Sequence, residues 1–137
     1  MNRQFVSIII VVAGVFAAGM ASAQQNRPYN QIMKDVGATF ASLRKNLDAN
    51  GAVAAAEDAA KLEGLFTETE AFWARLNTRD AIGFAKSARE ASAAVGAAAK
   101  NNDIKAAQAS IATVQKSCGL CHFSHREETD KGFLIKP

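Results

Sequence analysis

The chain of 137 residues contains little cysteine, proline, histidine or tryptophan, and each shortage narrows what the protein can be. Its two cysteines lie in one short motif and leave no pair for a structural disulfide. Pro28 and Pro137 are the only prolines, so the stretch between them has no residue that breaks helices. No basic cluster is interleaved with aromatic residues, which argues against nucleic-acid binding. No nucleophile with a neighbouring base is apparent, so an enzyme is not expected.

The N-terminus has the pattern of a secretory signal peptide. Arg3 supplies a positive charge, residues 5–20 are mostly apolar, and Ala21-Ser22-Ala23 fits a small-residue cleavage site. We therefore expect residues 1–23 to be removed on export to the periplasm. Residues 24–137 would remain as one domain without stable membrane association. The alternative is an uncleaved membrane anchor, for which the apolar stretch is short.

Four segments of the mature chain have the apolar periodicity of amphipathic helices. We expect helices over about residues 28–47, 52–76 and 80–99, and a fourth from 103 past His125, joined by short polar connectors. This organisation predicts an all-α fold, an antiparallel four-helix bundle. No segment predicts a strand, and the tail from 127 to 137 supports no prediction. The expected inward stripes are Met33, Val36, Phe40, Leu43 and Leu47; Leu62, Leu65, Phe66, Phe72, Trp73 and Leu76; Ala81, Phe84, Ala88, Ala91, Val95 and Ala98; and Ile104, Ala107, Ile111, Val114, Cys118 and Cys121.

Both cysteines and one of the two histidines form a single motif, Cys118-Gly119-Leu120-Cys121-His122. This CxxCH spacing is the one at which a c-type haem is attached. Cys118 and Cys121 would form thioethers with the haem vinyl groups, and His122 would bind the iron. Helix positions three and four apart share a face, so all three side chains can reach one haem. We therefore expect one covalently attached haem c per chain, on the inward stripe of the C-terminal helix.

Two alternatives for the cysteine pair need different surroundings. A redox disulfide of the thioredoxin type expects a βαβ context. A zinc site of two cysteines with His122 and His125 would normally draw its ligands from two chain segments, whereas these four lie within eight residues. His125 cannot easily reach the opposite haem face, and we expect it to be partly exposed near the haem edge.

Met33 is the candidate for the second axial ligand of the iron. Met1 and Met20 would be lost with the signal peptide, so Met33 would be the only methionine of the mature chain. It lies on the expected core stripe of the first helix, beside which the fourth helix would pack. Its thioether could bind iron or simply fill the core, the usual role of buried methionine, and position alone leaves both open.

A CxxCH motif on the last helix of a four-helix bundle, behind a signal peptide, resembles the class II cytochromes c, the family of cytochrome c prime. The resemblance covers about residues 28–126. Residues 33–40, with the sequence MKDVGATF, are similar to the Met-Lys-x-x-Gly-x-x-Phe stretch of the low-spin branch of this family. That likeness implies that Met33 is the sixth ligand. In cytochrome c prime an apolar residue usually holds this place and leaves five-coordinate iron.

The chain departs from the family pattern at two places. The family often has an arginine four residues before the axial position, where this chain has Tyr29, with Arg27 two residues earlier. The Tyr29 hydroxyl or Arg27 could take over that role. The family also tends to place an aromatic residue and then an arginine after the haem histidine, whereas here His125 precedes Arg126. Arg126 could contact a haem propionate or be a solvated surface residue.

These features together predict a periplasmic electron carrier. Met/His ligation favours ferrous iron, and six ligands in both oxidation states suit fast electron transfer. The expected partners are redox proteins that bind transiently near residues 118–126, and a homodimer is left open. If Met33 does not bind, the open face could take nitric oxide or carbon monoxide, as in cytochrome c prime. A third hypothesis is a stress or metal-binding protein without haem.

Overall fold

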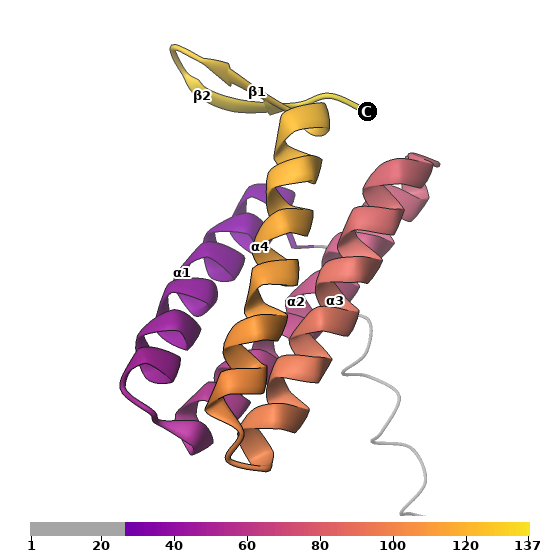
Figure 1. The fold of residues 1–137 in the computed structure, drawn as a ribbon. Helices are drawn as coiled ribbons and strands as arrows, with labels where there is room; N and C mark the ends of the chain where they lie inside the picture. The colour runs from indigo at the N-terminus through magenta and orange to yellow at the C-terminus, as the bar shows by residue number, and fades with distance from the viewer. Residues whose placement is uncertain (1–26) are drawn as a thin grey trace, which may run out of the picture.

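The computed structural model describes residues 27–137, which form four helices and a terminal hairpin. The helices follow one another up and down in an antiparallel, bundle-like arrangement (Figure 1). Their bounds are α1 Tyr29–Asp48, α2 Ala52–Arg75, α3 Arg79–Lys100 and α4 Ile104–His125, followed by strands β1 Arg126–Thr129 and β2 Gly132–Ile135. The prediction of a signal peptide over residues 1–23 lies outside the described residues. None of the helices in the described part is long and apolar enough to cross a membrane.

The mostly helical fold predicted from the sequence is confirmed, and each helix begins and ends within two residues of its expected bounds. Each of the three connectors contains an asparagine with positive φ shortly after the end of the helix. Asn50, Asn77 and Asn102 have φ values of 55°, 54° and 57°. Asparagine tolerates this left-handed conformation better than most residues, so it ends a helix cleanly. The side chain of Asp103 then caps α4 by accepting a hydrogen bond of 2.9 Å from the backbone N–H of Ala106.

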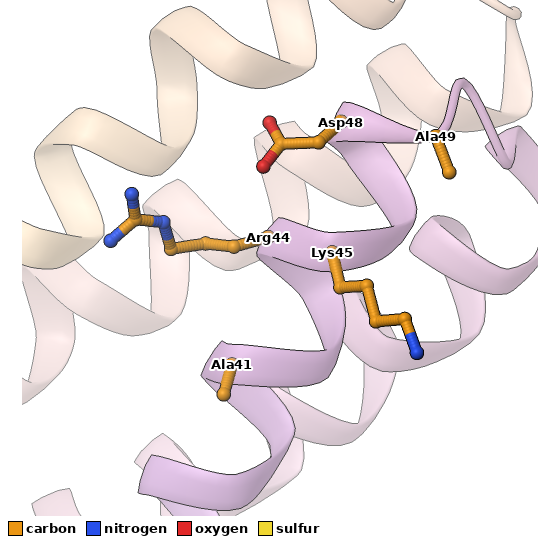
Figure 2. Close-up of a pocket in the computed structure, with 5 residues that line it drawn as sticks. All are labelled: Ala41, Arg44, Lys45, Asp48 and Ala49. Atoms are coloured by element: carbon orange, nitrogen blue, oxygen red, sulfur yellow. The ribbon is translucent and has the colours of Figure 1, made fainter.

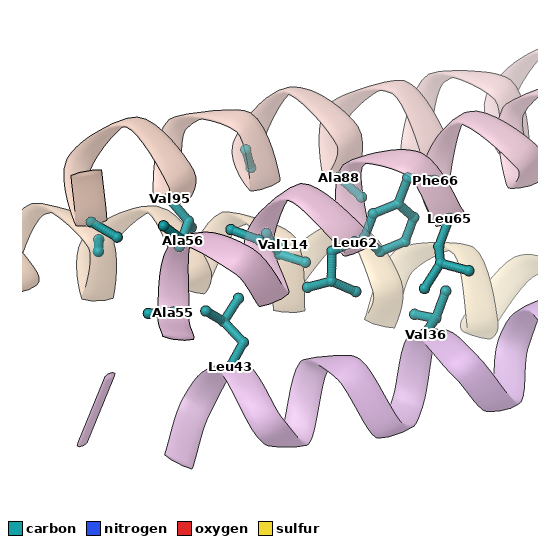
Figure 3. Packing of buried hydrophobic residues seen from close by; sticks show 14 of the residues in the cluster. Val36, Leu43, Ala55, Ala56, Leu62, Leu65, Phe66, Ala88, Val95 and Val114 are labelled. Atoms are coloured by element: carbon teal, nitrogen blue, oxygen red, sulfur yellow. The ribbon is translucent and has the colours of Figure 1, made fainter. Parts of the chain in front are cut away.

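The core lies where each helix packs on the next one along the chain. Large side chains of α1 and α2, such as Leu43 and Leu62, are fully buried and point toward each other (Figure 3). Helix α3 contributes mainly small residues, and these let α2 approach closely. A Cβ added at Gly96 would lie 3.5 Å from the Cβ of Ala59. Contacts are extensive between α1 and α2, α2 and α3, and α3 and α4, but sparse between α1 and α4.

The inward face of α1 agrees with the expected stripe at Val36, Leu43 and Leu47 but is turned slightly away from it at the other two positions. Ile32 and Thr39 are buried, whereas Met33 and Phe40 are only half-buried. The rotation follows from the packing, because α1 is held mainly by α2 and turns its most apolar side toward that helix. A similar difference occurs at the end of α2, where Leu76 is 43% exposed rather than part of the core.

The C-terminal hairpin contradicts the expectation that no segment forms a strand. Strands β1 and β2 pair antiparallel, with Arg126 opposite Ile135 and Thr129 opposite Gly132. Gly132 has φ +117°, a conformation that side chains disfavour, so glycine is required after the turn. Four-residue strands give almost no periodic signal, and Arg-Glu-Glu-Thr has little strand propensity. The hairpin therefore depends on tertiary contacts that the sequence pattern does not display.

Candidate functional site

The CxxCH motif occupies the last two turns of α4. Cys118, Cys121 and His122 are all half-buried, and both cysteines are free thiols. Cys118 also packs against the hydrophobic core. Because they are three and four residues apart on one continuous helix, the three side chains project to one side of α4. The helical setting predicted for the motif is therefore confirmed.

Burial shifts the pKa values of Cys118, Cys121 and His122 and so determines their protonation states. It raises the pKa of the Cys118 thiol, and burial together with the neighbouring Cys118 and Asp80 raises the pKa of Cys121 to about 11. Both thiols are therefore protonated at neutral pH. Burial, with a smaller contribution from the charge of Arg126, lowers the pKa of His122. A neutral imidazole has a free nitrogen lone pair, and no hydrogen bond within residues 27–137 occupies the ring of His122.

Neighbouring contacts show which flank of α4 carries the motif. The hydroxyl of Ser117 donates a hydrogen bond of 3.0 Å to that of Ser87, so this flank of α4 faces α3. At 3.6 residues per turn, His122 lies about 140° around the helix from Ser117. Cys118 lies between them on the inward side. The motif thus extends from the core toward the flank of α4 that faces α1 rather than α3.

The same reasoning places Met33 on the flank of α1 that faces away from α2. Arg27 forms ion pairs with Asp35 at 2.9 Å and with Glu68 of α2 at 3.2 Å, so the Asp35 flank faces α2. Met33 lies about 160° around α1 from Asp35. Both Met33 and Phe40 are half-buried and pack against the core. Besides α2, helix α1 contacts α4, although sparsely, and the helical repeat puts Met33 on the side of α1 away from α2.

Contacts between α1 and α4 are few compared with those of α1 with α2, α2 with α3 and α3 with α4. Met33 and Phe40 of α1, and Ile111 and Cys118 of α4, are partly buried side chains that pack against the core, and we call the boundary between these two helices the α1–α4 seam. Its donor set comprises two protonated thiols, one neutral imidazole and one thioether. A thioether and an imidazole ligate haem iron in cytochromes c, whereas the two thiols would add to the haem vinyl groups. The donors present in the seam therefore fit a haem c.

Three aromatic side chains, Tyr29, Phe72 and Trp73, pack on one another near the motif. Tyr29 stacks on Phe72 with ring centroids 4.0 Å apart, and its hydroxyl accepts a hydrogen bond of 2.9 Å from Nε1 of Trp73. Trp73 is only 1% exposed. Burial raises the pKa of Tyr29 to about 12, although the Trp73 hydrogen bond works against this rise, and Cys121 and Cys118 add to it. Tyr29 therefore remains a neutral phenol beside the two thiols.

The two arginines considered for haem propionates have different surroundings. Arg27 already neutralises Asp35 and Glu68, but its Nη2 atom is buried and has no hydrogen-bond partner among the described residues. That atom lies in the cluster that Arg27 forms with Asp35 and Glu68, on the flank of α1 opposite Met33. Arg126 is exposed, and its guanidinium lies over the ring of Phe133 at 4.3 Å from the centroid. The sequence pattern favoured Arg126, whereas the structure gives Arg27 the unused donor.

His125 lies in a different environment from the one expected. We expected a partly exposed residue, but His125 is only 8% exposed and packs on Trp73, with ring centroids 5.0 Å apart. Nδ1 lies 2.7 Å from the carbonyl oxygen of Lys136, and Nε2 lies 3.0 Å from Oδ2 of Asp80. These partners occupy both ring nitrogens. No group of three or more His, Cys, Asp or Glu side chains in residues 27–137 is arranged to hold a metal ion.

A hollow on the surface lies at the C-terminal end of α1 and shares no residue with the CxxCH motif. It is lined by Ala41, Arg44, Lys45, Asp48 and Ala49, and the long side chains of Arg44 and Lys45 extend away from the helix (Figure 2). All five residues are exposed. This surface offers no enclosed site, so the seam remains the candidate.

Comparison with known proteins adds no assignment, because no family model matches this chain and no curated protein matches it. The likeness to class II cytochromes c therefore depends on the residues themselves. These are the motif at 118–122 and the MKDVGATF stretch at 33–40. The functional interpretation has to be argued from the chemistry of the seam.

Proposed function

We propose that this chain is a c-type cytochrome of the class II kind, which carries electrons in the periplasm through one covalently bound haem. Cys118 and Cys121 would hold the haem, His122 would be one axial ligand and Met33 the other. The observation that supports the proposal is that Met33 of α1 and Cys118 of α4 both pack, partly buried, against the same hydrophobic core. No catalytic role is proposed.

When bound, the haem would supply an iron centre that changes between ferric and ferrous states. The protein's own residues have three tasks. Each cysteine thiol would add across one vinyl group, forming a C–S bond while the thiol proton goes to the other vinyl carbon, so no oxidant would be needed. His122, whose pKa is lowered by burial, would offer the iron a nitrogen lone pair. Met33 would offer an uncharged sulfur, and such ligation raises the reduction potential.

The outer surface of the motif suits brief contact with a redox partner. Phe123 is 86% exposed and Leu120 is 44% exposed, both within or next to the motif on α4. Apolar side chains that protrude beside charged ones, here Arg126, are typical of surfaces that bind partners. We propose that redox partners dock transiently over residues 118–126.

Met33→Leu tests the ligand set. Leucine keeps the volume of methionine at a cost below about 1.5 kcal/mol but removes the sulfur. We expect the ferric protein, matured with the haem-attachment machinery, to have a low-spin spectrum with a weak sulfur-to-iron band. Met33→Leu should convert this spectrum to high-spin. Ile32→Leu, a buried neighbour on the flank toward α2, is the matched control and should leave it unchanged.

Three other results of these measurements would each contradict part or all of the proposed function. A high-spin spectrum in the unmodified protein would replace electron transfer by the gas-binding alternative, in which nitric oxide or carbon monoxide takes the open face. An unchanged spectrum in Met33→Leu would exclude Met33 as a ligand. A pyridine haemochrome assay that finds no covalent haem would overturn the proposed function as a whole.

A further inference from the structure

The C-terminal hairpin has two different faces. In an antiparallel pair, residues directly opposite each other point to the same side, and successive residues of a strand point to opposite sides. Arg126 pairs with Ile135 and Glu128 pairs with Phe133, so these four side chains share one face. Leu134, between the two apolar residues of β2, points to the other face. We call the first of these the Phe133 face and the second the Leu134 face.

The Phe133 face borders the CxxCH motif. A hollow on the surface is lined by residues of both α4 and the hairpin, namely Gly119, His122, Phe123, Arg126 and Glu128. The two hairpin residues in this set belong to the Phe133 face, and the guanidinium of Arg126 lies over the Phe133 ring at 4.3 Å from its centroid. His122, the expected iron ligand, therefore lies beside the Phe133 face and not beside the Leu134 face.

The Phe133 face has apolar side chains without cover. Phe133 is 59% exposed and Ile135 is 41% exposed, and Phe123 on the adjacent turn of α4 is also exposed. Exposed apolar side chains that gather at one place are typical of surfaces that bind a ligand or partner. The two charged residues of this face, Arg126 and Glu128, have opposite signs. The face therefore offers no excess of charge that would select a charged ligand over an uncharged, apolar one.

The hairpin is held in its orientation at both ends. Helix α4 continues directly into β1, and just beyond β2 the N–H of Lys136 donates to the carbonyl oxygen of His125 at 2.9 Å. The ring of His125 lies 2.7 Å from the carbonyl oxygen of Lys136 through Nδ1 and 3.0 Å from Asp80 through Nε2. A two-stranded hairpin on its own is marginal in water, so these contacts keep the Phe133 face beside the motif.

We propose that the Phe133 face is a wall of the haem pocket, in which Phe133 and Ile135 cover the porphyrin on the side of His122 and keep water from it. The inference rests on the proposed function, because it takes the group held by Cys118 and Cys121 to be haem. Helix α4 ends three residues after His122, less than one turn, so cover beyond that level falls to the segment that follows. Phe133 and Ile135 are positioning residues, not ligands.

The expected consequence is a higher reduction potential. Ferric haem has one more positive charge than ferrous haem, and water favours the more highly charged form. Excluding water from the haem therefore favours the ferrous state, and burial is one of the means by which a protein sets the potential of its haem. Removing an apolar side chain from the Phe133 face should lower the potential and expose more of the haem to solvent.

Phe133→Ser and Leu134→Ser together test the proposal in the haem-loaded protein. The two residues are neighbours in β2 with almost equal exposure, 59% and 57%, but they point to opposite faces. The shift of the main haem absorption band on adding ethylene glycol measures how much haem surface is open to solvent. We expect this shift to be larger, and the reduction potential lower, in Phe133→Ser. Leu134→Ser should match the unmodified protein in both.

Phe133→Leu separates cover from the stacking of Arg126. Leucine keeps an apolar side chain at this place but removes the aromatic ring beneath the guanidinium. We expect Phe133→Leu to resemble the unmodified protein in both measurements. A Phe133→Leu variant that behaves like Phe133→Ser would overturn the proposal, since the ring and not the apolar cover would then matter.

A pyridine haemochrome assay on each protein separates failure of this inference from failure of the proposed function. If the unmodified protein has no covalent haem, both are overturned. If haem is attached but the two serine variants have equal effects, or neither has any, the covering role of the Phe133 face is overturned and the proposed function stands. Because both serines lie in the same short strand, a general loss of the hairpin would give equal effects.

Discussion

Tyr29 is the one tyrosine of the chain, and its ionisation reports directly on its packing against Phe72 and Trp73. Burial raises its pKa from the ordinary value of 10.0 to about 12. A titration of the Cζ resonance of carbon-13-labelled tyrosine follows this single group without interference. We expect a midpoint near 12, and a midpoint near 10 would refute the packing of Tyr29 against Phe72 and Trp73.

The shift has a consequence for stability whose sign is fixed. A pKa raised in the folded state means that the neutral phenol is favoured by folding, so the stabilisation is complete below about pH 10. It is lost progressively as pH rises from about 10 to about 12. A rise from 10.0 to about 12 corresponds to about 2.7 kcal/mol. The free energy of unfolding, measured with denaturant, should fall between about pH 9 and about pH 12. This fall should be larger in the unmodified protein than in Tyr29→Phe by an amount of this order, because the variant keeps the titrating lysines but has no phenol.

Trp73→Phe gives a second, opposite test of the same contact. The Trp73 hydrogen bond lowers the pKa of Tyr29, because a donor favours the phenolate. Removing the donor while keeping an aromatic ring should move the Tyr29 midpoint still higher. A midpoint that falls toward 10 would mean that water enters the site when the indole is removed, and that the indole acts by filling space rather than by its hydrogen bond.

Two further predictions concern the helices that carry the site. Asp103→Ala removes the cap of α4 and should lower the free energy of unfolding by about 0.5–2 kcal/mol in denaturant titrations, whereas Asp103→Ser, which can also cap, should cost much less. Gly96→Ala should raise the free energy of unfolding by about 0.4–1 kcal/mol, because the new Cβ would make ordinary contact with Ala59 at 3.5 Å and the unfolded chain would lose freedom. A destabilised Gly96→Ala would show that α2 and α3 cannot accommodate even one methyl group.

The helices were predictable because their signals are long and local. Twenty or more residues of periodic sequence define each one, α2 and α3 are rich in alanine, and no interior proline interrupts any of them. The connectors were recognisable as polar clusters, although the shared role of Asn50, Asn77 and Asn102 emerges only from their backbone angles. The CxxCH motif could likewise be placed on a helix from sequence alone, since its spacing matches the helical repeat.

The remaining features depend on contacts between distant residues. The rotation of α1 that buries Ile32 and half-exposes Met33 depends on α1 packing mainly on α2, which periodicity does not reveal. The hairpin and the burial of His125 depend on Asp80 and Lys136, at sequence separations of 45 and 11. A histidine at the end of a helix gives no local signal of such partners. Sequence reasoning therefore located the CxxCH motif but did not identify His125 as a residue that contacts both the C-terminal hairpin and α3.

The way in which α1 is held bears on the proposed haem site. Near its start, α1 is tied to α2 through Arg27 and Glu68, and near its end through a hydrogen bond of 2.8 Å from Asn46 to Asp58. Helix α4 is tied to α3, which packs extensively on α2. The separation of α1 from α4 is thus set by the two middle helices and not by direct contact. Because the middle helices hold α1 and α4 in place, a group bound between α1 and α4 would not have to break extensive contacts between these two helices, and we therefore propose this boundary as the haem site.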